Sequence, residues 1–337
     1  MDYLSRLEKK LIELDYDNNY KSICIKYAKK LLDNEALVVF DKKHLSLLMG
    51  IDLKILNYYI VNTDEFYNEK KIPKKNGRYR IISMPSYNLK RIQRWILDNI
   101  LYKLRVHSNA TGFIRNKSIV DNASCHVNKD VVVNIDISDF FPSIDFDKVF
   151  YMFYNLGYTK ELCYALSKLL TYKGILPQGA PSSPYIANVI MINIDLRLDG
   201  LTKKINSNYT RYADDITISG NKYIVLQLPF IKTIIESQGF KVNLEKLKIQ
   251  YRKSRQEVTG LVVNDRISVK REFKKNLRQH IYYCKRFGVY EHLKYTGNEE
   301  KSFYKEYLYG HAYFIKMVEP ECGERFIKEL DSINWDS

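Results

Sequence analysis

The segment Tyr212-Ala213-Asp214-Asp215 constrains the fold of this chain most, because the alternating run Ile216-Thr217-Ile218-Ser219 follows it at once. Alternating apolar and hydroxyl residues predict a strand with one buried face. Two adjacent acids at its start predict the tip of a β-hairpin, where the turn lets both carboxylates face one point. An Asp-Asp pair alone is most often a solvated turn, so a metal site requires a further acid.

A second acid lies in a predicted strand over residues 131–137. Valine and isoleucine occupy its odd positions, whereas Asn134 and Asp136 fall on the opposite face. An acid near a strand end is the plain alternative. Carboxylates brought together repel unless a cation neutralises them, however, and Mg²⁺ prefers oxygen ligands. Two such ions about 3.5 to 4 Å apart can activate a hydroxyl and stabilise leaving pyrophosphate, so the acids predict nucleotidyl transfer.

The charge of the chain favours a polyanionic partner. Lys and Arg number 54 against 39 Asp and Glu, which gives a formal charge of +15. Basic residues concentrate in residues 70–105, where Asp98 is the one acid, and in residues 241–286. A single basic segment is usually a solvated face. Two segments that flank a predicted metal site indicate the walls of a groove for a nucleic acid backbone.

The composition disfavours membrane and secreted classes. No run approaches the roughly 18 to 20 apolar residues of a spanning helix, and the N-terminal residues lack the apolar core of a signal peptide. The cysteines are dispersed and odd in number, at Cys24, Cys125, Cys163, Cys284 and Cys322. They show neither a disulfide framework nor zinc-ligand spacing, so we expect a cytoplasmic protein. A length of 337 residues suggests about two domains.

Periodicity places the remaining elements. Residues 1–62 read as helices, and Gly50 suggests a helical corner rather than a DNA-reading helix-turn-helix. Asn76-Gly77 predicts a hairpin within residues 72–85, and residues 89–104 return to helix. Ser182-Ser183-Pro184 predicts the start of one helix with an apolar stripe from residue 186 to 201. Residues 273–284 predict an amphipathic helix with a basic face.

Together these motifs resemble a reverse transcriptase. The resemblance rests on residues 136–141, the run Leu176-Pro177-Gln178-Gly179-Ala180-Pro181-Ser182-Ser183-Pro184, residues 212–215 and residues 239–246. It runs from about residue 40 to the C-terminus. Asn122-Ala123-Ser124-Cys125-His126 and Val258-Thr259-Gly260 are similar to two elements of bacterial retron reverse transcriptases.

The resemblance implies an α+β, right-handed polymerase whose palm contains an antiparallel sheet. The implied parts are an N-terminal helical segment over residues 1–59, fingers over 60–130, a palm over 131–262 interleaved with the fingers, and a helical thumb over 263–337. An appended RNase H or maturase domain is not expected within this length.

The resemblance also assigns the catalytic centre. Asp136 and Asp214 would bind two Mg²⁺ ions, with the backbone carbonyl of Ile137 as a further ligand and Asp215 supporting the site. Phe141 would exclude a 2′-hydroxyl and so favour dNTPs over rNTPs. A core aromatic is the alternative for Phe141, and Phe140 beside it is interpreted as one.

Further residues are expected to contact nucleotide or RNA. Side chains expected to hold the incoming nucleotide are those of Arg78, Arg80, Arg115, Lys117, Gln178 and Lys246, where ordinary phosphate-backbone charge is the alternative for the basic ones. Lys246 would protonate departing pyrophosphate, unless it is a plain surface lysine. Side chains expected in RNA recognition are those of Asn122, His126, Lys274, Lys275 and Arg278. A purely structural role is the alternative for His126.

The resemblance finally implies the reaction and its partners. A retron enzyme copies part of its own structured noncoding RNA into DNA, primed from an internal guanosine 2′-hydroxyl, and yields a branched RNA–DNA hybrid called msDNA. It implies a place in an antiphage system with an effector protein. Two alternatives remain: a group II intron-like or other bacterial reverse transcriptase, and a noncatalytic RNA-binding scaffold, against which the intact acids argue.

Overall fold

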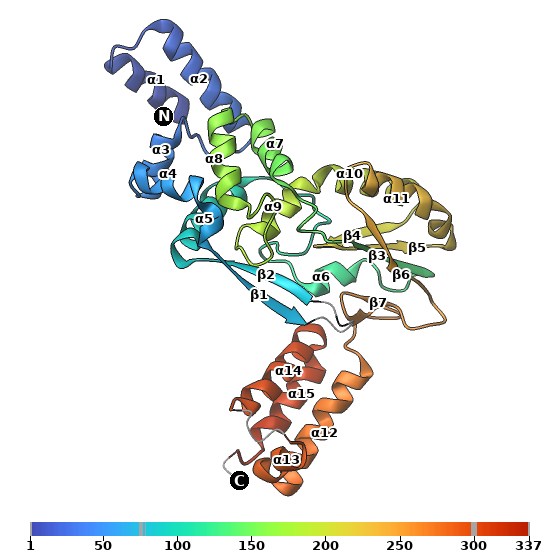
Figure 1. Ribbon diagram of the computed structural model, residues 1–337. Coiled ribbons are helices and arrows are strands. Elements are labelled where there is room, and N and C mark those ends of the chain that lie inside the picture. Colours follow the sequence, from blue (N-terminus) through green and yellow to red (C-terminus); the bar gives the residue numbers. More distant parts are fainter. Residues whose placement is uncertain (1, 74–76, 78, 298–301, 336–337) are drawn as a thin grey trace.

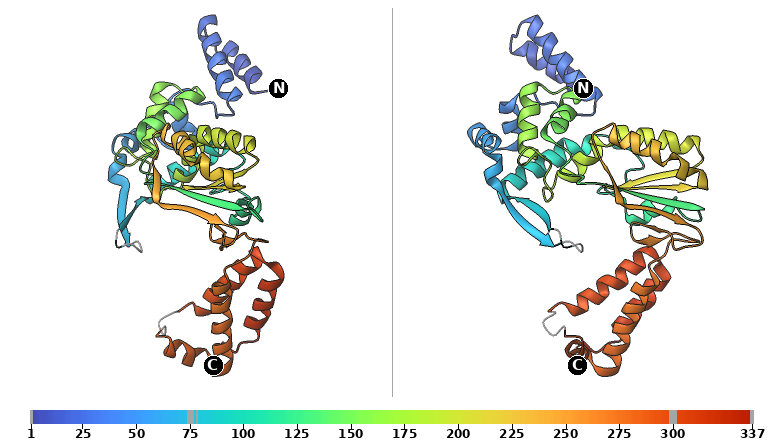
Figure 2. Two further views of the ribbon diagram at one scale, coloured as in Figure 1. Left: turned by 90° about the vertical axis from the view of Figure 1, so that its right-hand side faces the viewer. Right: turned by 45° about the vertical axis from the view of Figure 1, so that its right-hand side comes forward.

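The computed structural model describes residues 2–73, 77, 79–297 and 302–335 of the protein. The molecule is elongated, with helices at both ends and a β-sheet between them (Figure 1). Figure 2 shows that the C-terminal helices extend away from the sheet on the side opposite the N-terminal helices.

The helices of the described N-terminal region each begin after an aspartate. They are α1 (Tyr3–Glu13), α2 (Asn18–Asp33), α3 (Lys42–Met49) and α4 (Leu53–Val61). The carboxylates of Asp2, Asp17, Asp41 and Asp52 accept hydrogen bonds from first-turn N–H groups, which otherwise lack partners. Gly50, at φ +67°, ends α3 and makes the corner to α4, as the sequence predicts.

A two-stranded hairpin projects from the next segment. After η1 (Thr63–Phe66), strands β1 (Tyr67–Pro73) and β2 (Tyr79–Pro85) pair antiparallel, with Pro73 opposite Tyr79. The predicted hairpin is therefore confirmed, although Asn76 of its turn lies outside the described residues. Three helical elements follow: α5 (Tyr87–Asn99), η2 (Leu101–Lys103) and α6 (Ile119–Ser124).

The central sheet is antiparallel and has the order β4-β5-β3-β6. Its strands are β3 (Val131–Ile137), β4 (Asn208–Tyr212), β5 (Asp215–Gly220) and β6 (Val242–Tyr251). Val131, Val133, Ile135 and Ile137 join the main core, as their spacing predicts. The opposite face is also covered in part, because Val132 packs with Ala123 and with the small β7–β8 hairpin.

Helices cover the apolar face of the sheet (Figure 1). Those that contact its strands are α10 (Ile192–Lys204), η3 (Lys222–Gln227) and α11 (Leu228–Glu236). The helices α7 (Phe146–Leu156), α8 (Lys160–Leu170) and α9 (Ser183–Ile190) continue the same core toward the N-terminal helices. The prediction of one helix through residues 186–201 is wrong in one respect, since α9 and α10 are separate helices that meet at Met191. Met191 has φ −74° and ψ −5°, close enough to helical values for Ile194 and Leu198 to continue the buried stripe.

The C-terminal helices have a core of their own. After β7 (Glu257–Val258) and β8 (Leu261–Val262) come α12 (Arg271–Phe287), α13 (Val289–Tyr295), α14 (Tyr304–Val318) and α15 (Pro320–Asp331). Leu277, Ile281 and Cys284 are buried against these helices, which confirms the predicted amphipathic helix. A separate core indicates that this group is a structural unit distinct from the sheet region.

Candidate active site

The three predicted acids meet at one end of the central sheet. Tyr212 pairs with Asp215 across the β4–β5 hairpin, and Asp136 lies opposite Asp215 in the register of β3 and β5. The backbone N–H of Ile137 donates to the carbonyl of Asp214 at 3.2 Å. Two strands and one tight turn therefore fix the backbones of Asp136, Asp214 and Asp215 side by side.

The electrostatics of this end favour a cation. Burial, reinforced by the charges of Asp214 and Asp136, raises the pKa of Asp215 to about 6. Burial also raises the pKa of Asp214, and the carboxylate of Asp136 adds to that effect. Crowded carboxylates are costly to ionise together, and a bound divalent cation removes this cost.

Asp136 already has a cationic partner. Nζ of Lys246 lies 2.9 and 3.0 Å from its two carboxylate oxygens, and Nδ2 of Asn243 donates to it at 3.3 Å. The hydrogen bond to Asp136 raises the pKa of Lys246. Lys246 is therefore part of the acid cluster rather than a plain surface lysine. In the described residues, no three acid, histidine or cysteine side chains are already arranged around a metal position.

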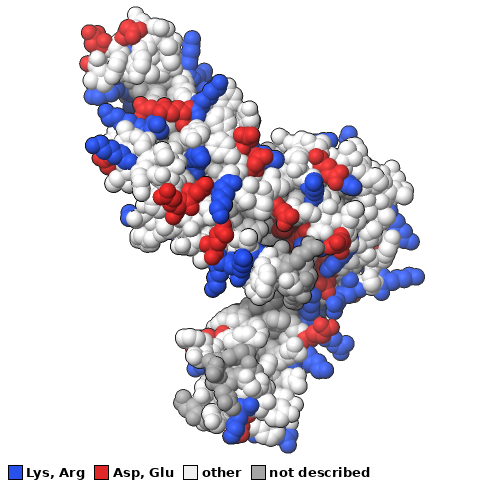
Figure 3. Space-filling view, viewed as in Figure 1, with Lys and Arg blue, Asp and Glu red and all other residues white. Residues whose placement is uncertain are grey.

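A groove of about 910 Å³ opens beside the acids. Basic residues on its walls are Lys246, Lys248, Arg255 and Lys270, drawn from β6, the β7–β8 region and the approach to α12. On the face shown in Figure 3, basic side chains gather where the sheet region meets the C-terminal helices. The groove therefore combines carboxylates at one end with positive walls, an arrangement that suits a phosphate backbone.

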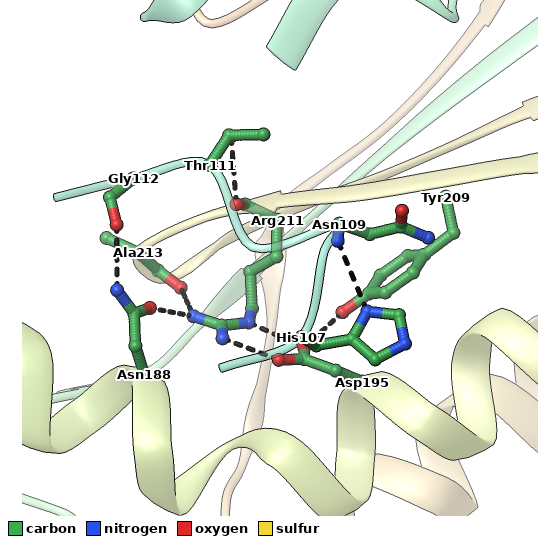
Figure 4. A network of polar contacts seen from close by, with 9 residues as sticks. All are labelled: His107, Asn109, Thr111, Gly112, Asn188, Asp195, Tyr209, Arg211 and Ala213. Carbon is green, nitrogen blue, oxygen red and sulfur yellow. Dashed lines mark hydrogen bonds and ion pairs between the residues drawn. The ribbon is translucent and has the colours of Figure 1, made fainter. Parts of the chain in front are cut away.

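A buried ion pair supports the acidic turn from below. The guanidinium of Arg211, fully buried, donates to both carboxylate oxygens of Asp195 at 2.7 Å, and to Oδ1 of Asn188 at 2.9 Å. It also donates to the carbonyl of Ala213 at 3.1 Å, within the turn itself. Figure 4 shows these side chains converging from β4 and the helices beneath it. The hydroxyl of Tyr209 donates to Asp195 at 2.5 Å and completes the network.

The turn is also enclosed from the side by residues 109–112. Thr111 donates from its backbone N–H to the carbonyl of Arg211 at 2.8 Å. A Cβ at Gly112 would lie 2.6 Å from the backbone nitrogen of Ala213, so only glycine fits this approach. Ala213 itself has φ +58°, a left-handed conformation that these contacts maintain.

Sequence reasoning missed the Arg211 network. One signal was present: Arg211 directly precedes the predicted hairpin tip and Asp195 lies within the predicted helix, so opposite charges occur in two elements that are expected to pack into the core. Because a buried charge requires a partner, that coincidence points to a pair. The pairing itself depends on how α10 packs beneath β4.

The two retron-like motifs contact each other beside the acids. Oδ1 of Asn122 accepts from the hydroxyl of Thr111 at 2.7 Å, and its Nδ2 donates to the hydroxyl of Thr259 at 3.4 Å. His126 is fully buried, with its ring nitrogens 2.6 and 2.8 Å from the hydroxyls of Ser219 and Thr210. Ala123, Val132, Val258, Leu261 and Val263 form the apolar core of this layer. Asn122 and His126 thus hold a surface in place rather than form it.

The chain is similar to proteins of one known family. A family model described as "Reverse transcriptase (RNA-dependent DNA polymerase)" matches residues 72–295. The retron Ec86 reverse transcriptase of Escherichia coli is 38% identical over 273 residues, covering 78% of this chain and 85% of its own length. The retron Mx162 reverse transcriptase of Myxococcus xanthus is 33% identical over 325 residues, covering 85% of this chain and 65% of its own. This chain belongs to the bacterial retron reverse transcriptases.

The enzyme is therefore an RNA-directed DNA polymerase with an α+β, right-handed polymerase fold. Among solved structures, a Candida albicans telomerase bound to a fragment of telomeric RNA superposes with a TM-score of 0.47 at 12% identity, covering 80% of this chain and 64% of that chain.

The residues expected to hold nucleotide occupy different settings in the retron enzyme. Arg80 lies near enough for its charge to lower the pKa of Asp214, although burial still raises that pKa overall. Arg115 instead pairs with Asp98 at 3.3 Å and covers the ring of Tyr102 at 3.8 Å. Lys117 is exposed, and Arg78 lies outside the described residues.

Gln178 and Phe141 are both held by contacts with neighbouring residues of the enzyme. The carbonyl of Gln178 accepts from the backbone N–H of Ser83 at 2.7 Å, which ties this loop to β2. Phe141 is half-buried and packs edge-on against Phe140, with ring centres 5.4 Å apart. Phe140 is buried, as the sequence interpretation expects.

The thumb residues expected to recognise RNA differ in accessibility. Lys274 is held by the carboxylate of Glu319, with Nζ 2.8 and 2.9 Å from its two oxygens. Lys275 and Arg278 are exposed, and the guanidinium of Arg278 lies 5.8 Å from the ring centre of Phe326. Lys274 therefore stabilises the thumb, while Lys275 and Arg278 are available to a ligand.

We predict that Asp195→Asn will destabilise the enzyme by about 3 to 5 kcal/mol, because it leaves the charge of Arg211 buried without a counterion. A double variant, Asp195→Leu with Arg211→Met, should recover most of that stability. It should still synthesise DNA poorly, because the carbonyl of Ala213 loses its donor. Urea unfolding and primer extension measure the two effects. Full DNA synthesis by a stable double variant would show that the pair only supports folding.

We predict a loss of stability at acidic pH that His126 causes. Burial lowers the pKa of His126 from its ordinary value of 6.5 to about 3. Between these pH values the unfolded state therefore binds a proton at His126 and the folded state does not. The contribution of neutral His126 to the free energy of unfolding is complete above pH 6.5. It falls by about 1.4 kcal/mol per pH unit as the pH drops from 6.5 towards 3. Urea unfolding between pH 7 and pH 5 should show a shallower decline for His126→Asn than for the unaltered protein. Parallel declines would contradict the assignment.

Proposed function

We propose that this enzyme copies part of its own structured noncoding RNA, starting from an internal guanosine 2′-hydroxyl, and produces branched msDNA. The observation that carries the proposal is the contact between Asn122 and Thr259 beside Asp136, Asp214 and Asp215. It joins the two retron-like motifs into one layer at the wall of the catalytic groove, where the priming RNA strand must lie. The names of its relatives, retron reverse transcriptases, support the choice of a retron reaction.

We further propose the division of the chain on which this reaction depends. Residues 1–59 form an N-terminal helical segment, residues 60–130 the fingers, residues 131–262 the palm and residues 263–337 the thumb. The separate core of α12, α14 and α15 supports the last boundary.

Two Mg²⁺ ions fit the acid cluster. The carboxylates of Asp136 and Asp214 and the backbone carbonyl of Ile137 would hold them, with Asp215 in support, since these are the hard oxygen ligands that Mg²⁺ prefers. Bound ions would activate the attacking hydroxyl and stabilise the leaving pyrophosphate. The raised pKa values of Asp214 and Asp215 support this assignment, because burial and the neighbouring carboxylates both disfavour their charged forms, and a cation would stabilise those forms.

Residues of the chain then position the dNTP. Lys246, at the groove, is placed to give a proton to departing pyrophosphate once it leaves Asp136. Phe141 would exclude a 2′-hydroxyl, and Gln178 would lie against the incoming nucleotide. The basic residues assigned to the triphosphate are Arg78, Arg80, Arg115 and Lys117, of which Arg115 would have to leave Asp98.

The partners follow from the same layer and from the thumb. Asn122 and His126 would shape the RNA-binding surface, and Lys275 and Arg278 would contact RNA phosphates. We propose that the complex acts in antiphage defence together with an effector protein, in the cytoplasm. All five cysteines are free, which suits a reducing compartment. None of the helices in the described part of the chain has the length and apolar character needed to cross a bilayer.

The catalytic proposal predicts that Asp214→Asn will abolish DNA synthesis, because the amide cannot hold the divalent cation. Rates should fall at least about 1,000-fold, in line with loss of metal-centred charge stabilisation. Primer extension on poly(rA)·oligo(dT) with Mg²⁺ and dTTP measures this. Asp265→Asn, an exposed acid outside the cluster, is the matched control and should retain full activity. Synthesis by Asp214→Asn at the control rate would refute the site.

The priming proposal predicts a branched product. The nucleic acid that copurifies with the enzyme should contain DNA joined to RNA through a 2′,5′ linkage, so treatment with debranching enzyme should shift its mobility on a denaturing gel. DNA with unchanged mobility after debranching would favour a different bacterial reverse transcriptase.

A further inference from the structure

The thumb contains a cavity of about 800 Å³ that shares no lining residue with the catalytic groove. It lies between α12 and α13. Asn276, Gln279 and Tyr283 line it from α12, and Glu291 and Tyr295 from α13. Its volume falls in the range that accommodates small molecules and single nucleotides.

One wall of this thumb cavity is a stack of rings. The ring of Tyr283 lies nearly parallel to those of His292 and Phe287, at interplanar angles of 25° and 28° and centre separations of 5.6 and 6.1 Å. Tyr295 is 92% exposed, the largest exposure among the protein's exposed large hydrophobic side chains in the described residues. A solvated tyrosine beside stacked rings provides flat surface without a protein partner, which suits a planar ligand.

The polar groups of the cavity suit the edge of a nucleobase. The amides of Asn276 and Gln279 offer donors and acceptors, and the carboxylate of Glu291 offers acceptors. A hydrophobic peptide would leave these groups unpaired, at a cost to its binding.

One positive side chain beside the cavity favours a nucleotide over an uncharged planar compound. The guanidinium of Arg286 lies 5.5 Å from the ring centre of Phe287 and donates to the hydroxyl of Tyr282. Arginine on an aromatic ring keeps its outer edge available to phosphate oxygens, so charge and stacking surface occur together.

We propose that the thumb cavity binds one unpaired nucleobase of an RNA strand, stacked on Tyr295 beside the ring stack of Tyr283, with its phosphate near Arg286. This inference rests on the proposed function, in which the enzyme holds a structured RNA. It adds that the thumb recognises an unpaired nucleotide of the RNA as well as a duplex backbone.

Photocrosslinking tests the proposal with the full-length protein freed of nucleic acid. The probe is a short single-stranded RNA that carries 5-iodouridine, a base that crosslinks to aromatic rings on which it stacks. We expect crosslinked peptides from α12 or α13 in the unaltered protein. Tyr295→Ala should remove the crosslink at that position and weaken RNA binding about tenfold, the loss of one stacked base.

Matched variants separate stacking from general damage. Tyr290→Ala removes an exposed tyrosine from the same helix, outside the cavity lining, and should leave crosslinking and affinity unchanged. Tyr283→Ala should act like Tyr295→Ala; because Tyr283 is half-buried, Tyr295→Ala remains decisive if Tyr283→Ala fails to fold. A duplex RNA of the same sequence should not crosslink at these helices.

The proposal is overturned by equal crosslinking of duplex and single strand at α12 and α13, by the absence of thumb crosslinks, or by unchanged binding in Tyr295→Ala. Primer extension by the unaltered enzyme on poly(rA)·oligo(dT) tests the polymerase function separately. Extension without thumb crosslinks refutes the cavity alone, whereas thumb crosslinks without extension refute the polymerase function alone.

Discussion

The active-site turn depends on one buried ion pair. Asp214 lies in the two-residue turn and Asp215 directly follows it. Ala213, the other turn residue, adopts a left-handed backbone that its local sequence does not favour. Arg211 compensates by bonding the carbonyl of Ala213 while Asp195 neutralises its charge. Because Arg211 is in β4 and Asp195 in α10, the turn keeps its shape only while helix and sheet stay packed. Chemistry at the surface is thus coupled to the core.

The acid cluster of Asp136, Asp214 and Asp215, unlike the Arg211–Asp195 pair, carries excess negative charge. Burial and the neighbouring carboxylates raise the pKa values of Asp214 and Asp215, and the charge of Lys246, which is bonded to Asp136, offsets this only in part. The folded chain therefore bears electrostatic repulsion at this point that the surrounding structure must tolerate. Divalent cations that bind together with a triphosphate would remove that repulsion, which would strengthen their binding. Such repulsion at the proposed catalytic acids is typical of a site whose charge a metal-bound substrate would stabilise.

Much of this architecture could be predicted from periodicity. The alternation in residues 131–137 predicted a strand, although the structure buries most of both its faces, and the spacing of Leu277, Ile281 and Cys284 predicted the amphipathic helix α12. The tertiary pairings were not accessible in the same way. The bond of Lys274 to Glu319 joins α12 to the junction of α14 and α15, and the break at Met191 changes the backbone too little to disturb the apolar stripe. Local patterns fix which residues turn inward, whereas the packing of distant elements decides which of them meet.

The position of β3 at the centre of the sheet has a consequence for synthesis on the ribosome. Asn134 bonds Thr217 and Gln250, which lie 83 and 116 residues later in the chain. At elongation rates of about 5 to 20 residues per second, β3 emerges about 4 to 23 seconds before its neighbours on either side. During that interval an apolar strand has two unpaired edges. Nascent chains of this enzyme thus pass through a window in which cellular chaperones compete with aggregation for the strand that later carries Asp136.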